Sequence, residues 1–437
     1  MAALIGRHGE KIAIFFASLS LALALIPCAR ASGELVLARA EIPLDGPWKF
    51  RIGDDPRWVD PHWDDGRWET VDLTPAPGAH DPDVGLEGYV PGWMERGHAD
   101  VYGFAWYRQR LRWRLAEGGR LVLIGPAYVE DAYEVYWNGK RVGGVGDFSR
   151  DEPRVIATRP TLMRLPAQGR SGEATIAIRV YFSPAMPRGG DAGGIHIAPI
   201  LAEETAGQAR YAAQWTKTFA GYVVDAVEPA LMLLLALYAV SIRRFAPRDK
   251  FYLPLAAALA ATAALRANQA VFFWGSFEDI GQFTIAKYTV LEPLILLLWS
   301  CAWNRWSGAP ARWIARLACL LAVLAAIGGS LGESGTMLRA AARLAFLLPL
   351  GMAAWALVRH GPIRFLAFVS LASIATGLYA EELSAIGVQG IWFPFGVGVS
   401  RTQYAYAVLI PALALLCHLR SAPKRNAHTQ PNDPAAA

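Results

Sequence analysis

Residues 219–241 read FAGYVVDAVEPALMLLLALYAVS, an apolar run long enough to cross the hydrocarbon core of a membrane, which takes about 20 residues. Six more runs of similar character follow it. We place the seven predicted spans at residues 219–241, 251–274, 283–303, 313–331, 337–358, 365–386 and 403–419. The sequence therefore predicts an all-α seven-helix transmembrane domain over residues 219–419.

The loops between these runs differ in their basic residues. Arginine and lysine follow the first, third, fifth and seventh runs, at Arg243, Arg244, Arg248, Lys250, Arg305, Arg312, Arg359, Arg364, Arg420, Lys424 and Arg425. The alternate loops are poor in them, and GSFEDIGQ (275–282) has none. Because basic loops stay in the cytoplasm, we expect a multi-pass protein of the bacterial inner membrane with a periplasmic N-terminal domain and a cytoplasmic C-terminus.

The N-terminus has the pattern of a secretory signal. Arg7, His8 and Lys11 precede an apolar stretch at 12–26, and Ala29-Arg30-Ala31 has the small-x-small form of a cleavage site. We expect a signal peptide over residues 1–31. An uncleaved anchor is the alternative, and it would leave the rest of the topology unchanged.

Residues 34–202 have a different composition, rich in Trp, Gly, Pro and Asp. Short β-branched or alternating runs such as RLVLIG (120–125) and ATIAIRVYF (174–182) predict an antiparallel β-sandwich. Asn138-Gly139 predicts a two-residue hairpin turn, since both positions tolerate positive φ. The tryptophans expected in the core are Trp48, Trp68, Trp106 and Trp137.

Four blocks of this half resemble the N-terminal sugar-binding jelly roll of family-two glycoside hydrolases such as β-galactosidase and β-glucuronidase. They are LDGPWKFRIGDD (44–55), HWDDGRWETVDL (62–73), GFAWYRQRLRW (103–113) and WNGKRVGGVG (137–146). The resemblance implies a galactose-binding-like jelly roll that binds carbohydrate. After Ile200 no alternating strands and helices predict the catalytic barrel of those hydrolases. We therefore expect a chain that is not an enzyme, with no cofactor, no metal site and no nucleic-acid partner.

The order of signal, jelly roll and seven helices is similar to that of seven-transmembrane receptors with diverse intracellular signalling modules. ALMLLLALYAVSIRRFAPRDKFYLPLA (230–256) carries the resemblance within the helices. It implies a sensor. In that family an output module follows the helices, whereas residues 420–437 predict a disordered cytoplasmic tail. We expect the signal to pass to a separate cytoplasmic partner.

Two loops of the exported half carry candidate ligand-binding residues. YVPGWMERGHADVY (89–102) has no strand pattern and has the mixed composition of an ordered functional loop. PRGGDAGGIH (187–196) is glycine-rich. The candidates in the two loops are Trp93, Glu95, Arg96, His98, Asp100, Asp191 and His196. The alternative is that the longer loop caps the sandwich or rests on the membrane helices.

The predicted spans contain ionisable residues, which are costly in a membrane and usually functional. They are Asp225, Glu228, Arg266, Lys287, Glu292, Arg339, Arg343, Glu381 and Glu382. The repeated texts VEPALMLLL (227–235) and LEPLILLLW (291–299) each place Glu before Pro. Two hypotheses stay open: a polar pocket in the outer half of the bundle, or acids and bases that pair and fix the register of the helices.

The sequence as a whole favours a receptor-like sensor for a carbohydrate or related periplasmic ligand, with residues 203–218 as a juxtamembrane linker that couples the two halves. A transporter or a membrane enzyme of envelope glycans, with the sandwich as an accessory carbohydrate-binding domain, is an alternative. A structural subunit of an envelope complex is another.

Overall fold

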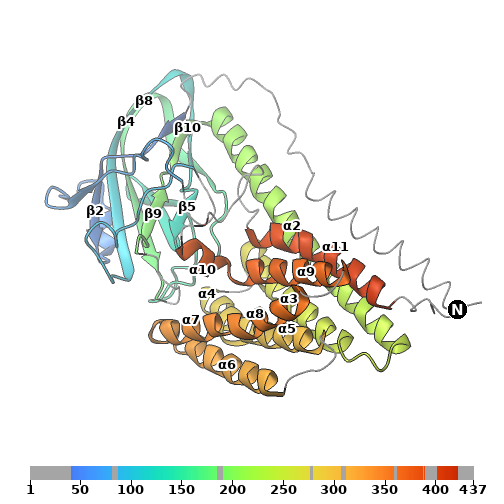
Figure 1. The fold of residues 1–437 in the computed structure, drawn as a ribbon. Coiled ribbons are helices and arrows are strands. Elements are labelled where there is room, and N and C mark those ends of the chain that lie inside the picture. Colours follow the sequence, from blue (N-terminus) through green and yellow to red (C-terminus); the bar gives the residue numbers. More distant parts are fainter. Residues whose placement is uncertain are drawn as a thin grey trace, which may run out of the picture.

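The computed structural model describes residues 41–80, 87–184, 190–275, 279–306, 312–358, 362–386, 388 and 401–421. The predicted signal peptide and residues 422–437 of the predicted tail lie outside these residues. A β-rich half lies beside a helical half, and the long helix α2 (Glu204–Phe245) joins them (Figure 1).

Antiparallel pairing builds the β-rich half. Eight strands form one sheet, in which β1, β10, β4, β8, β6 and β7 are neighbours in that order. In the same sheet β2 pairs with both β3 and β4. A separate two-stranded sheet consists of β5 and β9. The strands are β1 (Glu41–Pro43), β2 (Trp48–Ile52), β3 (Glu69–Val71), β4 (Gly103–Ile124), β5 (Tyr128–Glu130), β6 (Ala132–Trp137), β7 (Lys140–Val145), β8 (Leu162–Phe182), β9 (Gly194–Ile197) and β10 (Ile200–Glu203).

The predicted hairpin and the predicted tryptophan core are confirmed. Asn138 and Gly139 have φ of 48° and 81°, and they join β6 to β7 with Trp137 opposite Lys140. Positive φ at both positions is the geometry that matches the twist of a two-residue hairpin. The four tryptophans expected in the core, Trp48, Trp68, Trp106 and Trp137, are all buried. The turn therefore fixes the register that aims alternate side chains of β6 at the core.

Helices make up the remainder of the described chain after α2. They are α3 (Tyr252–Trp274), α4 (Ile280–Thr284), the π-helix η2 (Ile285–Leu291), α5 (Glu292–Trp306), α6 (Arg312–Ser330), η3 (Gly332–Gly335), α7 (Thr336–Ala345), α8 (Leu347–Val358), α9 (Pro362–Leu378), α10 (Ala380–Ala385) and α11 (Arg401–Ser421). A core that includes Tyr252, Trp299, Trp303 and Tyr406 holds them together.

Five helices of the described chain are long and apolar enough to cross a membrane: Glu204–Phe245, Tyr252–Trp274, Ile280–Trp306, Arg312–Ser330 and Arg401–Ser421. The chain is therefore a membrane protein by the length and composition of its helices. Two of the seven predicted spans are not single helices of this length. The fifth run divides into α7 and α8 at Phe346, and the sixth divides into α9 and α10 at Tyr379.

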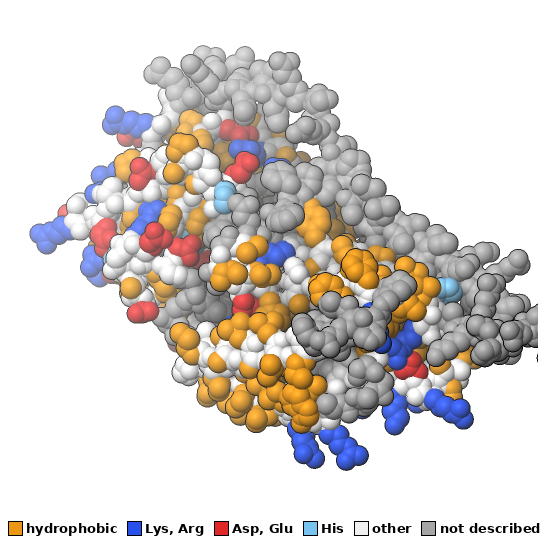
Figure 2. Space-filling view, in the orientation of Figure 1, with side chains coloured by type: hydrophobic (Ala, Val, Ile, Leu, Met, Phe, Trp, Pro, Cys, Tyr) orange, Lys and Arg blue, Asp and Glu red, His pale blue; other side chains and the backbone are white. Residues whose placement is uncertain are grey.

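The surface of the helical half agrees with a lipid environment. Figure 2 shows apolar side chains gathered over the helices in the lower part of the view, and lysine and arginine side chains at the end remote from the sheet. Leu320, Val323 and Leu331 are among the exposed apolar residues, each more than half exposed. In water such a continuous apolar surface would be unfavourable, whereas acyl chains cover it at no such cost.

The segment predicted as a linker, residues 203–218, is helical from Glu204 onward and continues without a break into the first apolar run. Its text, ETAGQARYAAQWTK, consists mainly of residues that favour helix and contains no proline. At 1.5 Å per residue, the 42 residues of α2 span about 63 Å. About half of that length is enough to cross a bilayer, so α2 extends well beyond the membrane.

Candidate functional site

The two predicted ligand loops lie against each other in the β-rich half. The backbone N–H of Gly92 donates to Asp191 O (2.6 Å), and that of Trp93 donates to Gly193 O (2.9 Å). Gly193 has a φ of +90°, and a Cβ there would lie 2.6 Å from the Trp93 ring. Glycine is required at this point because the backbone passes directly over an indole. The glycine-rich text thus packs the two loops together.

Trp93 lies in the core of the β-rich half. Its side chain is buried, its Nε1 donates to Val101 O (2.9 Å), and its ring meets Phe182 edge to face at 6.0 Å. A sugar stacks on an open ring face, and here both faces are covered. The role of Trp93 in ligand binding stays a prediction.

The rest of the longer loop is held by its polar side chains. Arg96 donates from Nε to Pro91 O (2.9 Å) and from Nη1 to Asp72 O (3.0 Å), so it ties the loop to the chain after β3. His98 Nε2 lies 2.9 Å from Glu69 Oε2. Glu95 and Asp100 are exposed. This loop therefore presents carboxylates to solvent on a backbone fixed by Arg96.

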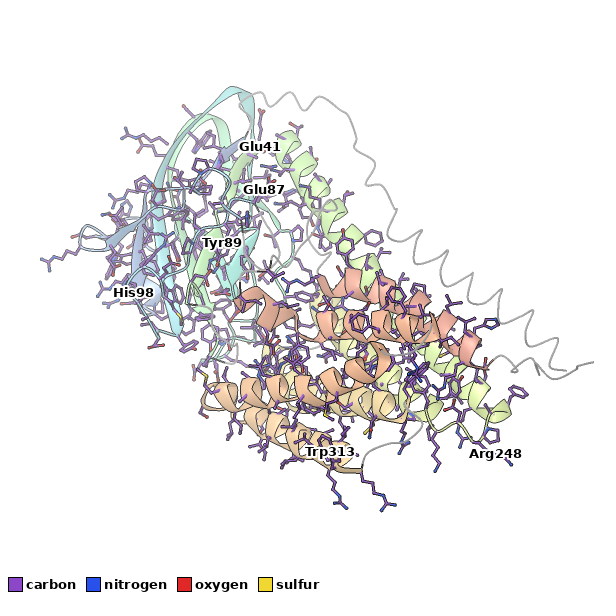
Figure 3. The ribbon with its side chains drawn as sticks, in the orientation of Figure 1. Glu41, Glu87, Tyr89, His98, Arg248 and Trp313 are labelled. Atoms are coloured by element: carbon purple, nitrogen blue, oxygen red, sulfur yellow. The ribbon has the colours of Figure 1, made fainter. Side chains whose placement is uncertain are left out.

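A second contact group in the β-rich half contains His196 and Asp191. His196 is fully buried and stacks on Tyr89 at 4.8 Å, and the Tyr89 hydroxyl donates to Asp191 Oδ2 (2.7 Å). His196 Nδ1 lies 2.9 Å from Val90 O, and its Nε2 lies 3.4 Å from Glu130 Oε2. The predicted residues thus divide into two groups, and Figure 3 shows Tyr89 and His98 well apart on the sheet half.

Sequence reasoning did not find Tyr89 and Glu130 as partners of His196. Glu130 also accepts from Gly193 N (2.6 Å), so its carboxylate joins the end of β5 to the glycine-rich loop. Its signal in the sequence is weak, since Glu130 stands in VEDAYEVYW (129–137) as one acid among strand residues. The next residue, Asp131, is buried, and the Ser183 N–H donates to its Oδ2 (2.8 Å). Burial raises the pKa of the Asp131 carboxyl to about 8.

All nine charged residues predicted in the spans take part in ion pairs, in two groups. The α2 cluster consists of Asp225, Glu228, Arg266, Gln269 and Gln403. Arg266 donates from Nε to Glu228 Oε2 (3.1 Å), from Nη2 to Asp225 Oδ1 and from Nη1 to Gln269 Oε1. Gln403 Nε2 donates to Asp225 Oδ1 (2.8 Å). The cluster joins α2, α3 and α11.

The second group, the α7 cluster, consists of Lys287, Tyr288, Glu292, Arg339, Arg343, Glu381 and Glu382. Arg343 is at its centre, donating to Glu292 Oε2 (2.5 Å), to Glu382 Oε1 (2.6 Å) and to Leu378 O (2.7 Å). Lys287 Nζ donates to Glu381 Oε1 (2.8 Å), and the Arg339 guanidinium lies 4.0 Å from the Tyr288 ring centroid.

The position of this cluster at a distorted helix is informative. Lys287 and Tyr288 lie on η2, a π-helix within the continuous helix that runs from Ile280 to Trp306. Single π-helical turns in longer helices are frequent at functional sites. The geometry agrees with the hypothesis that acids and bases pair between the helices, because the charged side chains form ion pairs with residues of other helices.

The β-rich half contacts the helices in two places. At the first, α2 begins one residue after β10 and lies on β4: a Cβ on Gly207 would be 2.3 Å from Val122 Cγ2, and Arg210 Nε lies 3.3 Å from Glu41 Oε2. Figure 3 places Glu41 beside the start of α2. The sheet and the helix are therefore in direct contact where one becomes the other.

At the second place, the segment after β7 rests on the turn between α3 and α4. Val155 and Tyr181 share a buried apolar cluster with Phe272 and Phe283, whose rings stack at 4.5 Å. Ile280 N donates to Val155 O (3.3 Å), and Arg159 Nη2 donates to Gly275 O (2.6 Å). The β-rich half thus contacts the C-terminal end of α3 and the start of α4 as well as α2.

Comparison with known proteins gives matches to solved structures only. No family model matches the chain, and no curated protein matches it. Similar solved structures include a β-glucuronidase of Bacteroides uniformis (20% identity, TM-score 0.27) and a family-two glycosyl hydrolase of Bacteroides cellulosilyticus (21%, 0.27), each over 37% of this chain. A β-galacturonidase of Eisenbergiella tayi, bound to galacturonate, covers the same share (18%, 0.23).

These matches cover 18%, 20% and 24% of the three solved chains, so this chain spans about a fifth of their length. They correct one expectation from the sequence, namely that the chain is not an enzyme. The structures to which it is similar are glycoside hydrolases, and the likeness extends over 37% of this chain.

Proposed function

We propose that this chain is a membrane receptor-like sensor. Its exported domain is a galactose-binding-like jelly roll that binds a carbohydrate or a related periplasmic ligand, and its seven-helix bundle passes the bound state to a separate cytoplasmic partner. The observation that carries this proposal is the continuity of β10 with α2. Because α2 begins at the residue after β10, a displacement of the sheet at Glu203 also displaces the start of α2, and α2 continues from there into the first apolar run.

The basic residues set the direction of the signal. Figure 3 places Arg248 and Trp313 at the end of the helices remote from the sheet, where Figure 2 shows lysine and arginine gathered. Basic loops face the cytoplasm, so the sheet is periplasmic in this proposal. The hydrogen bond from Ile280 N to Val155 O gives the exported domain a second contact with the membrane helices, on their periplasmic side in this proposal.

The ligand site of the proposal lies on the two loops of the exported domain. Glu95 and Asp100 supply exposed carboxylates, which accept hydrogen bonds from sugar hydroxyls. Asp191 and His196 link the glycine-rich loop to β5 through Tyr89 and Glu130, so a ligand that shifts this loop also shifts the strand beside it.

The test uses the full chain in lipid nanodiscs. The first measurement is its melting temperature across neutral and acidic oligosaccharides, since a ligand at 100 times its Kd adds about 2.7 kcal/mol to stability. The second is hydrogen exchange in the α2–α3 loop, residues 246–251, with and without the stabilising sugar. We expect one sugar class to raise the melting temperature and change exchange in that loop. If no sugar stabilises the protein, a carbohydrate is not its ligand.

Gly207→Val tests the route through α2. Its side chain would push α2 away from Val122, so the sugar should still stabilise the protein while the change in exchange at residues 246–251 is lost. Gly351→Ala is the matched control, because a Cβ there meets no atom within 4 Å. If Gly207→Val keeps the full change in exchange, the signal does not pass through this joint.

A further inference from the structure

The α2 cluster is unbalanced in charge. It brings two carboxylates, Asp225 and Glu228, to a single guanidinium, that of Arg266, and all three side chains are at least nine-tenths buried. Among the residues that the structure describes, the other groups near it are neutral: Gln269 of α3, with Gln403 and Tyr406 of α11. With both carboxylates ionised, the cluster would hold one uncompensated negative charge among membrane helices.

The α7 cluster shows the contrast. It sets three cations, Lys287, Arg339 and Arg343, against the carboxylates of Glu292, Glu381 and Glu382, so its charges cancel. The imbalance is therefore local to the α2 cluster.

The two carboxylates of the α2 cluster are not equivalent. Asp225 Oδ1 accepts from Arg266 Nη2 and from Gln403 Nε2. Within the described part of the chain, Glu228 accepts only through Oε2, from Arg266 Nε, and its Oε1 is buried without a hydrogen-bond partner. An anion is stabilised by the donors that reach it, so Asp225 is the better-stabilised anion and Glu228 the worse.

We propose that Glu228 holds a proton, which makes the α2 cluster a proton-binding site within the membrane bundle. An uncompensated buried carboxylate is costly, and a buried group in that position takes up a proton instead of keeping its charge. The proton sits on Oε1, the atom without a donor. Because Glu228 and Asp225 lie on α2, loss of the proton would set two anions against Arg266 and weaken the contact of α2 with α3.

Vibrational spectroscopy of the full chain in nanodiscs tests this proposal, because the carbonyl stretch of a protonated carboxyl is distinct from the bands of a carboxylate. All samples carry Asp131→Asn, since burial raises the pKa of Asp131 to about 8 and its protonated carboxyl would add a band of its own. We expect a protonated-carboxyl band at neutral pH that disappears in Glu228→Gln and persists in Glu292→Gln.

Glu292→Gln is a matched control because LEPLILLLW repeats the Glu-Pro text of VEPALMLLL in a cluster whose charges balance. Glutamine has the shape and charge of protonated glutamate. Glu228→Gln should therefore leave the melting temperature unchanged, whereas Glu292→Gln should lower it by leaving three cations with two anions.

Four results would overturn the proposal. They are the absence of the band at neutral pH, a band that persists in Glu228→Gln, a band lost in Asp225→Asn instead, and a Glu228→Gln protein that does not fold. A band that appears only when sodium is withdrawn would mean that the site holds a sodium ion and not a proton.

Discussion

Replacement of Arg343 by methionine tests whether the α7 cluster stabilises the bundle. The guanidinium donates to Glu292, to both oxygens of Glu382 and to Leu378 O, and its side chain is 4% exposed. Methionine keeps much of the volume but strands two carboxylates. Breaking a buried ion pair in this way costs about 3–5 kcal/mol.

The lower end of that range applies here. After the substitution, Glu292 still has Arg339 Nη1 at 3.5 Å and Lys287 Nζ at 3.9 Å, so its charge stays partly compensated. We therefore expect a loss of about 3 kcal/mol. Arg112→Met is the matched control, because its ion pair with Glu173 is exposed on both sides and such pairs contribute about 0–1 kcal/mol.

The assay is unfolding of the full chain by denaturant in detergent micelles, followed by the fluorescence of its 16 tryptophans. Adding Glu382→Gln to Arg343→Met should restore part of the lost stability, since it removes one stranded charge. A loss for Arg343→Met no greater than that for Arg112→Met would refute the reasoning, and so would a double variant less stable than Arg343→Met alone.

Two further predictions concern the β-rich half. Asp131 is protonated in the folded state up to a pKa of about 8 but ionised in the unfolded chain above its ordinary pKa, so stability should fall as the pH rises between those values, by up to about 1.4 kcal/mol per pH unit. Asp131→Asn should flatten this slope in denaturant unfolding followed from pH 5 to 8, and an unchanged slope would contradict the assignment. Gly139→Ala should cost about 1–2 kcal/mol, because φ at this position is +81° and a Cβ there is strained in that region. The measurement is the unfolding free energy relative to Gly351→Ala, and equal values for the two variants would show that the turn is not strained.

Local sequence patterns predicted the hairpin and the apolar helices, but they did not predict where the helices begin and end. The hairpin at Asn138 could be predicted because its φ preference is a property of two residues, and the apolar runs because lipid contact depends on composition. The continuity of residues 204–218 with the first span was missed. Those residues mix alanine with charged and polar residues and lack the continuous apolar pattern of a span, and their helix packs on Val122, which is distant in sequence.

The charged residues of the spans could be found from the sequence, but their partners could not. Asp225 meets Gln403 across 178 positions, and Arg343 meets Glu292 across 51. Spacing along one helix says which charges share a face, whereas packing between helices decides which faces meet. His196 shows the same limit, because its partner Glu130 lies on another strand.

The proposed function rests on one continuous helix that joins the β-sheet to the first apolar run of the helical half. Hydrogen exchange of the backbone amides of residues 208–218, in the full chain in lipid nanodiscs, tests it most directly. Amides bonded within a continuous helix exchange slowly, as far as local opening allows. The account predicts protection that continues from residue 208 into the apolar part of α2. Exchange at the rate of an unstructured peptide across residues 208–218 would contradict it, because a flexible linker cannot transmit a displacement of the sheet.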